Sequence, residues 1–226
     1  MNILLLGCGK TGSQVAEVGR ERGHQVEILR AADNPKASAL TKDRLKNVAV
    51  VIDFTNPQVV EEHIHACARA GTCMVVGTTG WHGKLASIKK EVEKHGAGLL
   101  YAANFSVGVN LFIEAARSAA EALRHRYSGQ IFERHHAEKK DAPSGTALAL
   151  QKAISEHTGT ELEITSFREG EVVGLHELIL QSPNDRIYLC HDAKSRRGYA
   201  EGAVRAAEWL VGKKGVFDFR DVWKEI

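Results

Sequence analysis

The twelve residues from His135 to Thr146 (HHAEKKDAPSGT) crowd together groups that can bind an anion and transfer a proton. The segment contains two histidines, His135 and His136, and two lysines, Lys139 and Lys140. An imidazole with an ordinary pKa of about 6.5 exchanges a proton close to neutrality. A lysine ammonium pairs with a carboxylate or, when it is desolvated, serves as an acid itself. These residue types indicate a site that binds a carboxylate-bearing substrate and delivers a proton to it.

The end of this segment predicts a helix that begins near Thr146 and runs to about His157. Pro143 precedes Ser144, Gly145 and Thr146, and together they have the composition of a helix start. The first amides of a helix and the positive end of its dipole favour an anion. Neighbouring residues on a strand point to opposite faces, so His135 and His136 share a pocket only if a strand ends there.

Three other interpretations of the segment remain open. The histidine pair could ligate a metal with Glu138 or Asp141, but no third histidine or cysteine has a suitable spacing, so we expect no metal site. Ser144 could be a nucleophile, but the G-x-S-x-G pattern is missing. The third interpretation is a solvated, charged loop without a ligand.

A glycine-rich loop near the start of the chain predicts nucleotide binding. Gly7, Gly9 and Gly12 form the pattern G-x-G-x-x-G between an apolar strand, Ile3 to Leu6, and a helical stretch to about Arg22. In that context the glycines allow a tight turn, close approach to a pyrophosphate and close helix packing. The alternative is a purely structural turn. The candidate cofactor-binding residues of this loop are Gly7, Cys8, Gly9, Lys10, Thr11 and Gly12.

The residue that contacts the adenine ribose is expected about twenty positions after the loop, where Asp33 fits by count. Arg30 stands close to it. A carboxylate favours the free 2′-hydroxyl of NADH, and an arginine favours the 2′-phosphate of NADPH. The sequence therefore leaves the choice between NADH and NADPH open.

Two further strand ends carry candidate cofactor contacts. Gly77, Thr78 and Thr79 offer amides and hydroxyls suited to a ribose, a nicotinamide amide or a substrate carboxylate, although a simple turn is the alternative. Ala102 and Ala103 precede Asn104, which could hydrogen-bond near the nicotinamide or cap a helix, and Phe105, which could exclude water.

The order of predicted elements indicates two domains. Apolar strands at 3–6, 26–29, 48–54, 73–76 and 99–102 alternate with helices, which predicts a Rossmann-type, doubly wound parallel sheet of the α/β class. After Asn104 come helices at 109–126 and 146–157 and strands at 130–133, 162–167, 172–180 and 186–190. This succession predicts a second, α+β domain with a mixed sheet. A last helix, 199–211, is expected to return to the first domain.

Composition excludes several classes of protein. The chain has 226 residues, 43% of them hydrophobic, and a net charge of +2, so it is globular and does not attract nucleic acid by charge. Its four cysteines form no C-x-x-C pair, which is typical of a reducing compartment. No apolar run is long enough to cross a bilayer, and no export signal precedes the first strand. We therefore expect a cytoplasmic protein that contacts no membrane.

Taken together, these residues resemble the dihydrodipicolinate reductase family, also called the 4-hydroxy-tetrahydrodipicolinate reductase family. The likeness spans nearly the whole chain in the right order. The motifs that carry it are Gly7 to Gly12, Asp53 to Pro57, Gly77 to Gly80, Ala102 to Asn110, Glu133 to Leu148, Arg168-x-Gly170 with Gly174-x-His176, and Ser195-Arg196 before Ala200-x-Gly202.

The resemblance implies a reductase of the diaminopimelate route to lysine. Hydride from NADH or NADPH would reduce 4-hydroxy-tetrahydrodipicolinate, a cyclic dicarboxylate, to tetrahydrodipicolinate at a cleft between the domains. His135 would donate or accept a proton and Lys139 would donate one, while His136, Ser144, Gly145 and Thr146 would bind the dicarboxylate. The resemblance also implies a dinucleotide-binding domain, 1–106 plus 199–226, a substrate-binding and oligomerisation domain, 107–198, and a homotetramer.

Two other functions fit the same plan. An amino-acid or aldehyde dehydrogenase would accept amino acids or aldehydes as hydride donors. A nucleotide-sensing protein would bind the dinucleotide without oxidising it.

Overall fold

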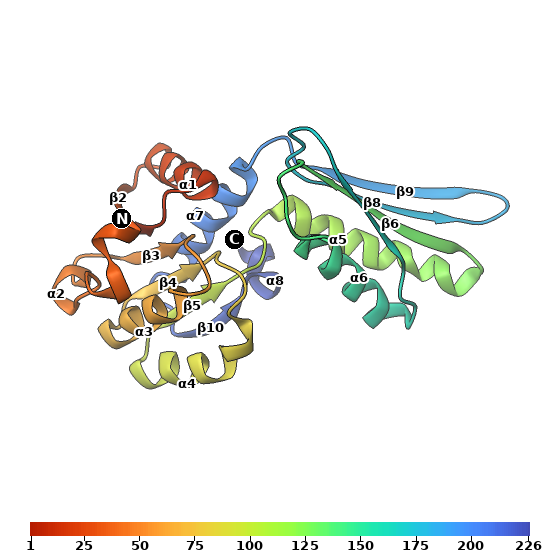
Figure 1. The fold of residues 1–226 in the computed structure, drawn as a ribbon. Coiled ribbons are helices and arrows are strands. Elements are labelled where there is room, and N and C mark those ends of the chain that lie inside the picture. The colour runs from red at the N-terminus through yellow and green to blue at the C-terminus, as the bar shows by residue number, and fades with distance from the viewer. The chain divides into compact units, whose positions relative to one another are not determined.

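The computed structural model describes all 226 residues, and the chain folds into two compact units. The first unit consists of Met1–Ser106 with Arg197–Ile226, and the second of Val107–Arg196. Figure 1 shows both, with the chain leaving the first unit after β5 and returning to it through α7. No helix combines the length and the apolar character needed to cross a membrane.

The first unit is built on a six-stranded sheet in which every pairing is parallel. The strand order is β10-β5-β4-β3-β1-β2. Its strands are β1 (Asn2–Leu6), β2 (Gln25–Leu29), β3 (Val50–Asp53), β4 (Cys73–Val76), β5 (Gly98–Tyr101) and β10 (Gly215–Asp218). The expected doubly wound α/β fold is confirmed. The order reverses beside β1, which is the place where such sheets bind ligands.

Helices cover both faces of this sheet (Figure 1). One face carries α1 (Lys10–Glu21) and α7 (Arg197–Leu210), and the other carries α3 (Val60–Ala70) and α4 (Leu85–His95). The central strands are buried on both sides, and all four residues of β3 are inaccessible to solvent. Short elements complete the unit: α2 (Lys42–Leu45), α8 (Phe219–Val222) and the 3-10 turns Ala31–Asp33, Pro35–Ala37, His82–Lys84 and Trp223–Glu225.

Two local features of this unit do not follow from local sequence patterns. Asn56 and Pro57 have the composition of a helix start, but α3 begins at Val60, because the Asn56 side chain accepts a hydrogen bond from the Gln58 amide (3.1 Å) and closes a turn first. Strand β10 was not predicted. It follows α7 and pairs only with β5, so its conformation depends on an available sheet edge.

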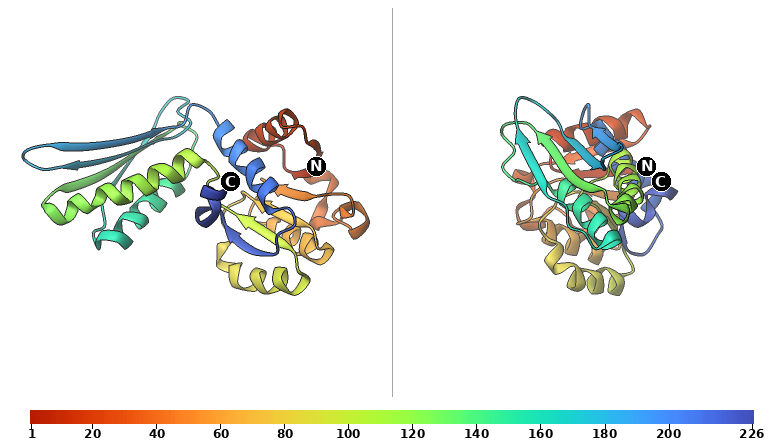
Figure 2. Two further views of the ribbon diagram at one scale, coloured as in Figure 1. Left: turned by 180° about the vertical axis from the view of Figure 1, so that it is seen from behind. Right: turned by 90° about the vertical axis from the view of Figure 1, so that its right-hand side faces the viewer.

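The second unit is a four-stranded mixed sheet covered on one face by two long helices. Its order is β7-β6-β8-β9, with β6 and β7 parallel and the other pairs antiparallel. Figure 2 shows α5 and α6 together on the covered face. The elements are α5 (Val107–Ala119), the 3-10 turn Ala120–His125, β6 (Ser128–His135), α6 (Gly145–Thr158), β7 (Ile164–Arg168), β8 (Leu175–Gln181) and β9 (Arg186–Asp192). The expected α+β arrangement is confirmed.

Candidate active site

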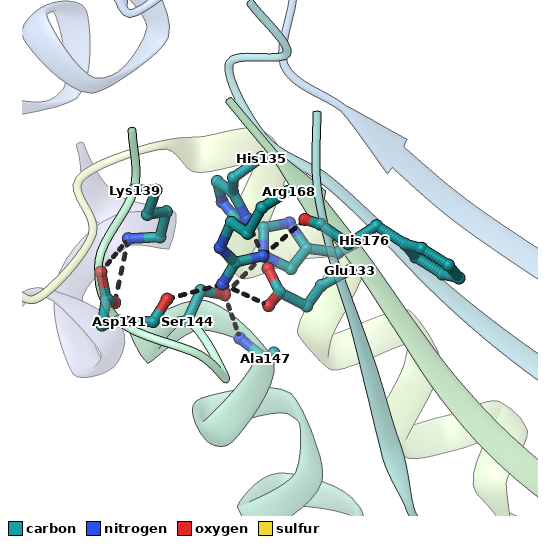
Figure 3. A network of polar contacts seen from close by, with 9 residues as sticks. Glu133, His135, Lys139, Asp141, Ser144, Ala147, Arg168 and His176 are labelled. Carbon is teal, nitrogen blue, oxygen red and sulfur yellow. Dashed lines mark hydrogen bonds and ion pairs between the residues drawn. The ribbon is translucent and has the colours of Figure 1, made fainter. Parts of the chain in front are cut away.

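The register of the mixed sheet brings four polar side chains together at one end of its covered face (Figure 3). Glu133 and His135 lie two residues apart on β6, so their side chains share a face. His176 on β8 is the cross-strand partner of Glu133, and Arg168 on β7 is the partner of His135. The apolar residues on this face belong to the hydrophobic core. The four polar groups therefore lie where water is largely excluded.

Glu133 is the charged centre of this group and is fully buried. Arg168 donates to one carboxylate oxygen at 2.7 Å, and Nδ1 of His135 contacts the other. Burial by itself raises the pKa of Glu133, but hydrogen bonds from Arg168 and Ser166 outweigh it and bring the pKa below the usual range. Glu133 is therefore a carboxylate that orients the His135 ring.

His135 is uncharged at neutral pH, because burial lowers its pKa against the opposing attraction of Glu133. Its Nδ1 carries the proton that faces Glu133, which leaves Nε2 with an available lone pair. The two imidazole rings of His135 and His176 meet edge to face at 5.1 Å. Burial also lowers the pKa of His176 to about 3, so this second ring adds no charge.

Ser144 links the histidine cluster to the start of α6. Its Oγ accepts a hydrogen bond from the Ala147 amide (3.2 Å) as the N-cap of the helix and lies 3.2 Å from Nε2 of His176. A hydroxyl held in this way caps the helix, and the ring beside it fixes its direction. The Gly145 and Thr146 amides belong to the first turn of α6, where the helix dipole favours an anion.

Lys139 and His136 lie just beyond the end of β6. The Lys139 ammonium forms an ion pair with both carboxylate oxygens of Asp141, at 2.7 and 2.9 Å, on the loop that approaches Arg168 (Figure 3). Arg168 donates to the backbone carbonyl of Asp141 (2.6 Å) and so holds this loop against the cluster. His136 is half-buried and follows the last strand residue, as the strand-end condition required.

Ligand atoms of Glu133, His135 and His176 come within 4.8 Å of one another, close enough to consider a metal ion. This set differs from the one considered from sequence, which paired the two histidines with Glu138 or Asp141. The guanidinium of Arg168 already neutralises the Glu133 carboxylate, so a cation there would face a fixed positive charge. The arrangement suits an oriented imidazole better than a metal centre.

The glycine loop lies at the carboxyl end of β1 and opens onto a cleft of about 330 Å³. The residues that line it are Gly9, Lys10, Thr11, Gly12, Phe54, Thr55, Asn56, Pro57, Gly77, Thr78 and Thr79. The cleft therefore joins the loop to the ends of β3 and β4. This position at the reversal of strand order is where a dinucleotide binds in sheets of this type.

The glycines around the cleft differ in how much space a side chain would have. A Cβ on Gly12 would lie 2.4 Å from the Gly7 carbonyl oxygen, and Gly7 itself has a φ of +91°. A Cβ on Gly77 would lie 2.2 Å from the Phe54 ring. Gly9 is different, because a Cβ there would meet nothing within 4 Å. The protein leaves the space over Gly9 open, which fits a pyrophosphate resting on the backbone.

Comparison with known proteins agrees with this geometry. The family model described as dihydrodipicolinate reductase, N-terminus, matches residues 1–105, and the one described as dihydrodipicolinate reductase, C-terminus, matches residues 108–223. The chain belongs to the dihydrodipicolinate reductase family. The family and the reductase class expected from the motifs are thereby confirmed.

Relatives of this reductase family match along most of the chain. The 4-hydroxy-tetrahydrodipicolinate reductase of Christiangramia forsetii is 35% identical over 240 residues, covering 100% of this chain and 99% of the relative. That of Chromobacterium violaceum is 40% identical over 201 residues, covering 79% of this chain and 74% of the relative. The fold matches the dipicolinate-bound reductase of Paenisporosarcina sp. TG-14 with a TM-score of 0.79 at 20% identity, covering 98% and 99%.

Not every residue predicted from sequence faces the cleft. Phe105 is buried between Phe54 and Phe219, with ring centroids at 6.2 and 5.0 Å, so its side chain belongs to the core. Ala102 is buried as well. Ala103 is exposed, and the Asn104 side chain accepts a hydrogen bond from the Ser106 amide (2.8 Å). Cys8 and Asp33 are exposed and do not line the cleft.

Glu133 is the site residue that sequence reasoning missed, although it lies within a recognised motif. The available signal was its spacing of two from His135, because alternate residues of a strand share a face, but the predicted strand ended at Glu133 and β6 continues to His135. Arg168 and His176 stand in the sequence only as residues of a family motif, with no role assigned to them. Their contacts with Glu133 and Ser144 depend on which strands pair, and that pairing cannot be read from the local sequence.

Proposed function

We propose that this reductase converts 4-hydroxy-tetrahydrodipicolinate, a hydride from NADH or NADPH and a proton to tetrahydrodipicolinate and water, on the diaminopimelate route to lysine. The observation that carries the proposal is the buried Glu133–His135 pair beside Lys139 and the start of α6, in a chain of this family. Four free cysteines support a reducing cytoplasmic location.

The residues of the glycine cleft are suited to hold the dinucleotide. Gly9 and Gly12 would accommodate its pyrophosphate, the amides and hydroxyls of Thr78 and Thr79 its ribose and nicotinamide, and Asp33 or Arg30 its adenine ribose. When bound, NADH or NADPH supplies the hydride. Lys10, which lines the cleft, adds a positive charge for a phosphate.

The second unit supplies the groups for a cyclic dicarboxylate. The Gly145 and Thr146 amides at the start of α6 suit one carboxylate, and the cations of the neighbouring loop suit the other. Lys139 is paired with Asp141, so a substrate carboxylate would compete for the same ammonium. His136, half-buried at the end of β6, completes this set.

Proton delivery is divided between Lys139 and His135. His135 is uncharged at neutral pH and its one proton faces Glu133, so it holds no spare proton for the product. Lys139 carries the available acidic proton. We therefore infer that Lys139 is the proton source for the product, and that Nε2 of His135 accepts a proton where the reaction releases one, with Glu133 stabilising the imidazolium that forms.

A coupled assay tests the function. Aspartate semialdehyde and pyruvate are condensed in situ by the upstream synthase, and oxidation of NADH or NADPH is followed. We expect oxidation only when both precursors are present, and Lys139→Ala is expected to lower turnover by about 10²-fold or more. Lys140→Ala, at an exposed neighbouring lysine, is the matched control and should leave turnover within about twofold.

Other outcomes of this assay select the alternatives. Dinucleotide binding without oxidation would point to a sensor. Reduction of NAD⁺ by an amino acid would point to an amino-acid dehydrogenase.

We also propose that the uncovered face of the mixed sheet joins copies of this chain into a homotetramer. The strand register puts Phe132, Phe167, Ile179 and Tyr188 on this face. Phe167 and Tyr188 are 40% and 52% exposed, and the Phe132 and Phe167 rings stack at 6.5 Å. Large apolar side chains gathered on a single sheet face are typical of an interface.

Charged substitutions on this face test the assembly. We expect Phe167→Glu with Tyr188→Glu to lower the mass measured by light scattering from that of a tetramer to that of a monomer or dimer, because a buried unpaired charge opposes association. Leu111→Glu, at an exposed leucine of α5, is the control and should leave the mass unchanged. A wild-type protein that is monomeric at micromolar concentration would contradict the proposal.

A further inference from the structure

A chain of buried polar groups runs from the glycine cleft to the loop after β2. It consists of Asp53 at the end of β3, His63 on α3 and Asn34, which are 0%, 3% and 6% exposed. Nδ1 of His63 lies 2.7 Å from Oδ2 of Asp53, and Nε2 of His63 lies 3.1 Å from Nδ2 of Asn34. None of these side chains belongs to the proton-transfer site.

The contact between Asn34 and Ala39 determines which group donates in each of these hydrogen bonds. The Asn34 carbonyl oxygen accepts from the Ala39 amide at 3.0 Å, so its amide nitrogen faces His63 and donates. Nε2 of His63 must then accept, which leaves Nδ1 as the donor to Asp53. These hydrogen bonds therefore require a neutral His63 ring with its proton on Nδ1. Only this arrangement lets the three side chains form all of them.

At the end next to the glycine cleft, Asp53 forms hydrogen bonds with two residues that line this cleft. Its Oδ1 accepts from the Thr55 amide (2.9 Å), the Thr55 hydroxyl (2.7 Å) and the Thr78 hydroxyl (2.7 Å). Thr55 and Thr78 both line the cleft. The carboxylate thus joins the ends of β3 and β4 where a dinucleotide would rest.

At the other end, Asn34 anchors the loop that follows β2. It immediately follows Asp33, the exposed candidate for the adenine ribose. Lys36 and Ala37, two and three residues further on, have left-handed φ values of 51° and 59°, which residues with a Cβ seldom adopt. A loop with this backbone needs an anchor, and the buried Asn34 side chain supplies it through Ala39 and His63.

We propose that His63 and Asn34 are positioning residues that hold the loop 31–39 in register with the glycine cleft and thereby determine the discrimination between NADH and NADPH. The proposal rests on the proposed use of a dinucleotide. The two nucleotides differ only at the 2′ position of the adenine ribose. A displaced loop should therefore change the ratio of their affinities, while contacts to the shared pyrophosphate and nicotinamide remain.

Two variants each remove the hydrogen bond between Asn34 and His63, one by changing the donor and the other by changing the acceptor. Asn34→Ala removes the donor to His63 together with the acceptor for the Ala39 amide. His63→Asn keeps a donor near the Nδ1 position for Asp53 but is too short to reach Asn34. Dissociation constants for NADH and NADPH are measured by direct titration of each folded variant, together with kcat at saturating nucleotide. His24→Gln is the matched control, because His24 lies in the same unit and pairs with Glu208 instead.

We expect each variant to change the ratio of the two dissociation constants by about fivefold or more, the scale of one lost hydrogen bond. The double variant should change the ratio no further than Asn34→Ala alone, because that substitution already removes the interaction that His63→Asn removes. Turnover at saturating nucleotide should stay within about twofold, and His24→Gln should leave the ratio unchanged. The ring ¹⁵N signals of His63 are identified as those that are present in the wild-type protein and absent from His63→Asn. Their chemical shifts should be those of a neutral ring protonated on Nδ1.

The contrary outcomes are distinct. An unchanged ratio in folded His63→Asn, an equal weakening of both nucleotides, or a His63 protonated on Nε2 would each overturn the inference. A wild-type protein that binds neither nucleotide would instead overturn the proposed function. If Asn34→Ala does not fold, His63→Asn, which keeps the buried Asp53 paired, carries the test alone.

Discussion

His135→Gln is expected to lower turnover in the coupled assay by about 10²- to 10⁴-fold, the usual contribution of a positioned acid–base group. The reason is the geometry around Glu133, which orients the His135 ring and leaves Nε2 as the acceptor. A glutamine amide fills similar space but does not exchange a proton near neutrality. Affinity for NADH should change by less than about twofold, since the glycine cleft belongs to the other unit.

His157→Gln is the matched control for this substitution. His157 lies in the same unit, pairs with Glu121 at 3.1 Å and is 34% exposed at its side chain. Its replacement should leave turnover unchanged. Turnover of His135→Gln within threefold of wild type, in a protein that keeps its melting temperature, would remove His135 from the mechanism.

Gly12→Ala is expected to weaken NADH binding by about tenfold to hundredfold, the equivalent of ~1–3 kcal/mol of overpacking. The added Cβ would lie 2.4 Å from the Gly7 carbonyl oxygen, and a backbone atom cannot move aside as a flexible side chain does. The first turn of α1 must therefore separate from the turn after β1, which deforms the cleft. Calorimetric titration with NADH measures the loss, and a lower melting temperature should accompany it.

Substitutions at two other glycines distinguish an effect on stability from an effect on NADH binding. A Cβ on Gly9 meets nothing within 4 Å, so Gly9→Ala should keep the wild-type melting temperature and still weaken NADH binding, because the methyl group enters the cleft. Gly83→Ala also meets nothing within 4 Å, lies outside the cleft and should change neither quantity. Wild-type affinity in both Gly9→Ala and Gly12→Ala would show that the dinucleotide does not bind at this loop.

The first unit shows how far local patterns reach. The strands Ile3 to Leu6 and Cys73 to Val76 were predicted almost to the residue, because a strand buried on both faces is a short apolar run and a glycine turn follows it. Gly202 shows the limit of such patterns. A Cβ there would lie 1.8 Å from the Phe105 carbonyl oxygen, so this glycine is needed for contact between segments about a hundred positions apart.

The amino-acid sequence by itself determined the kinds of chemistry available to this protein. The glycine loop, the His135 segment and the order of strands and helices identified the fold, the family and the candidate groups, because each depends on residue types and short spacings.

Only the tertiary structure decided which of those groups act together. Strand register brought Arg168 and His176 to Glu133, and the surrounding core lowered the pKa of His135. Packing turned Phe105 inward and joined Asp53 to Asn34 through His63. Pairing between distant strands and the removal of water depend on the whole set of neighbours, and those neighbours exist only once the chain has folded.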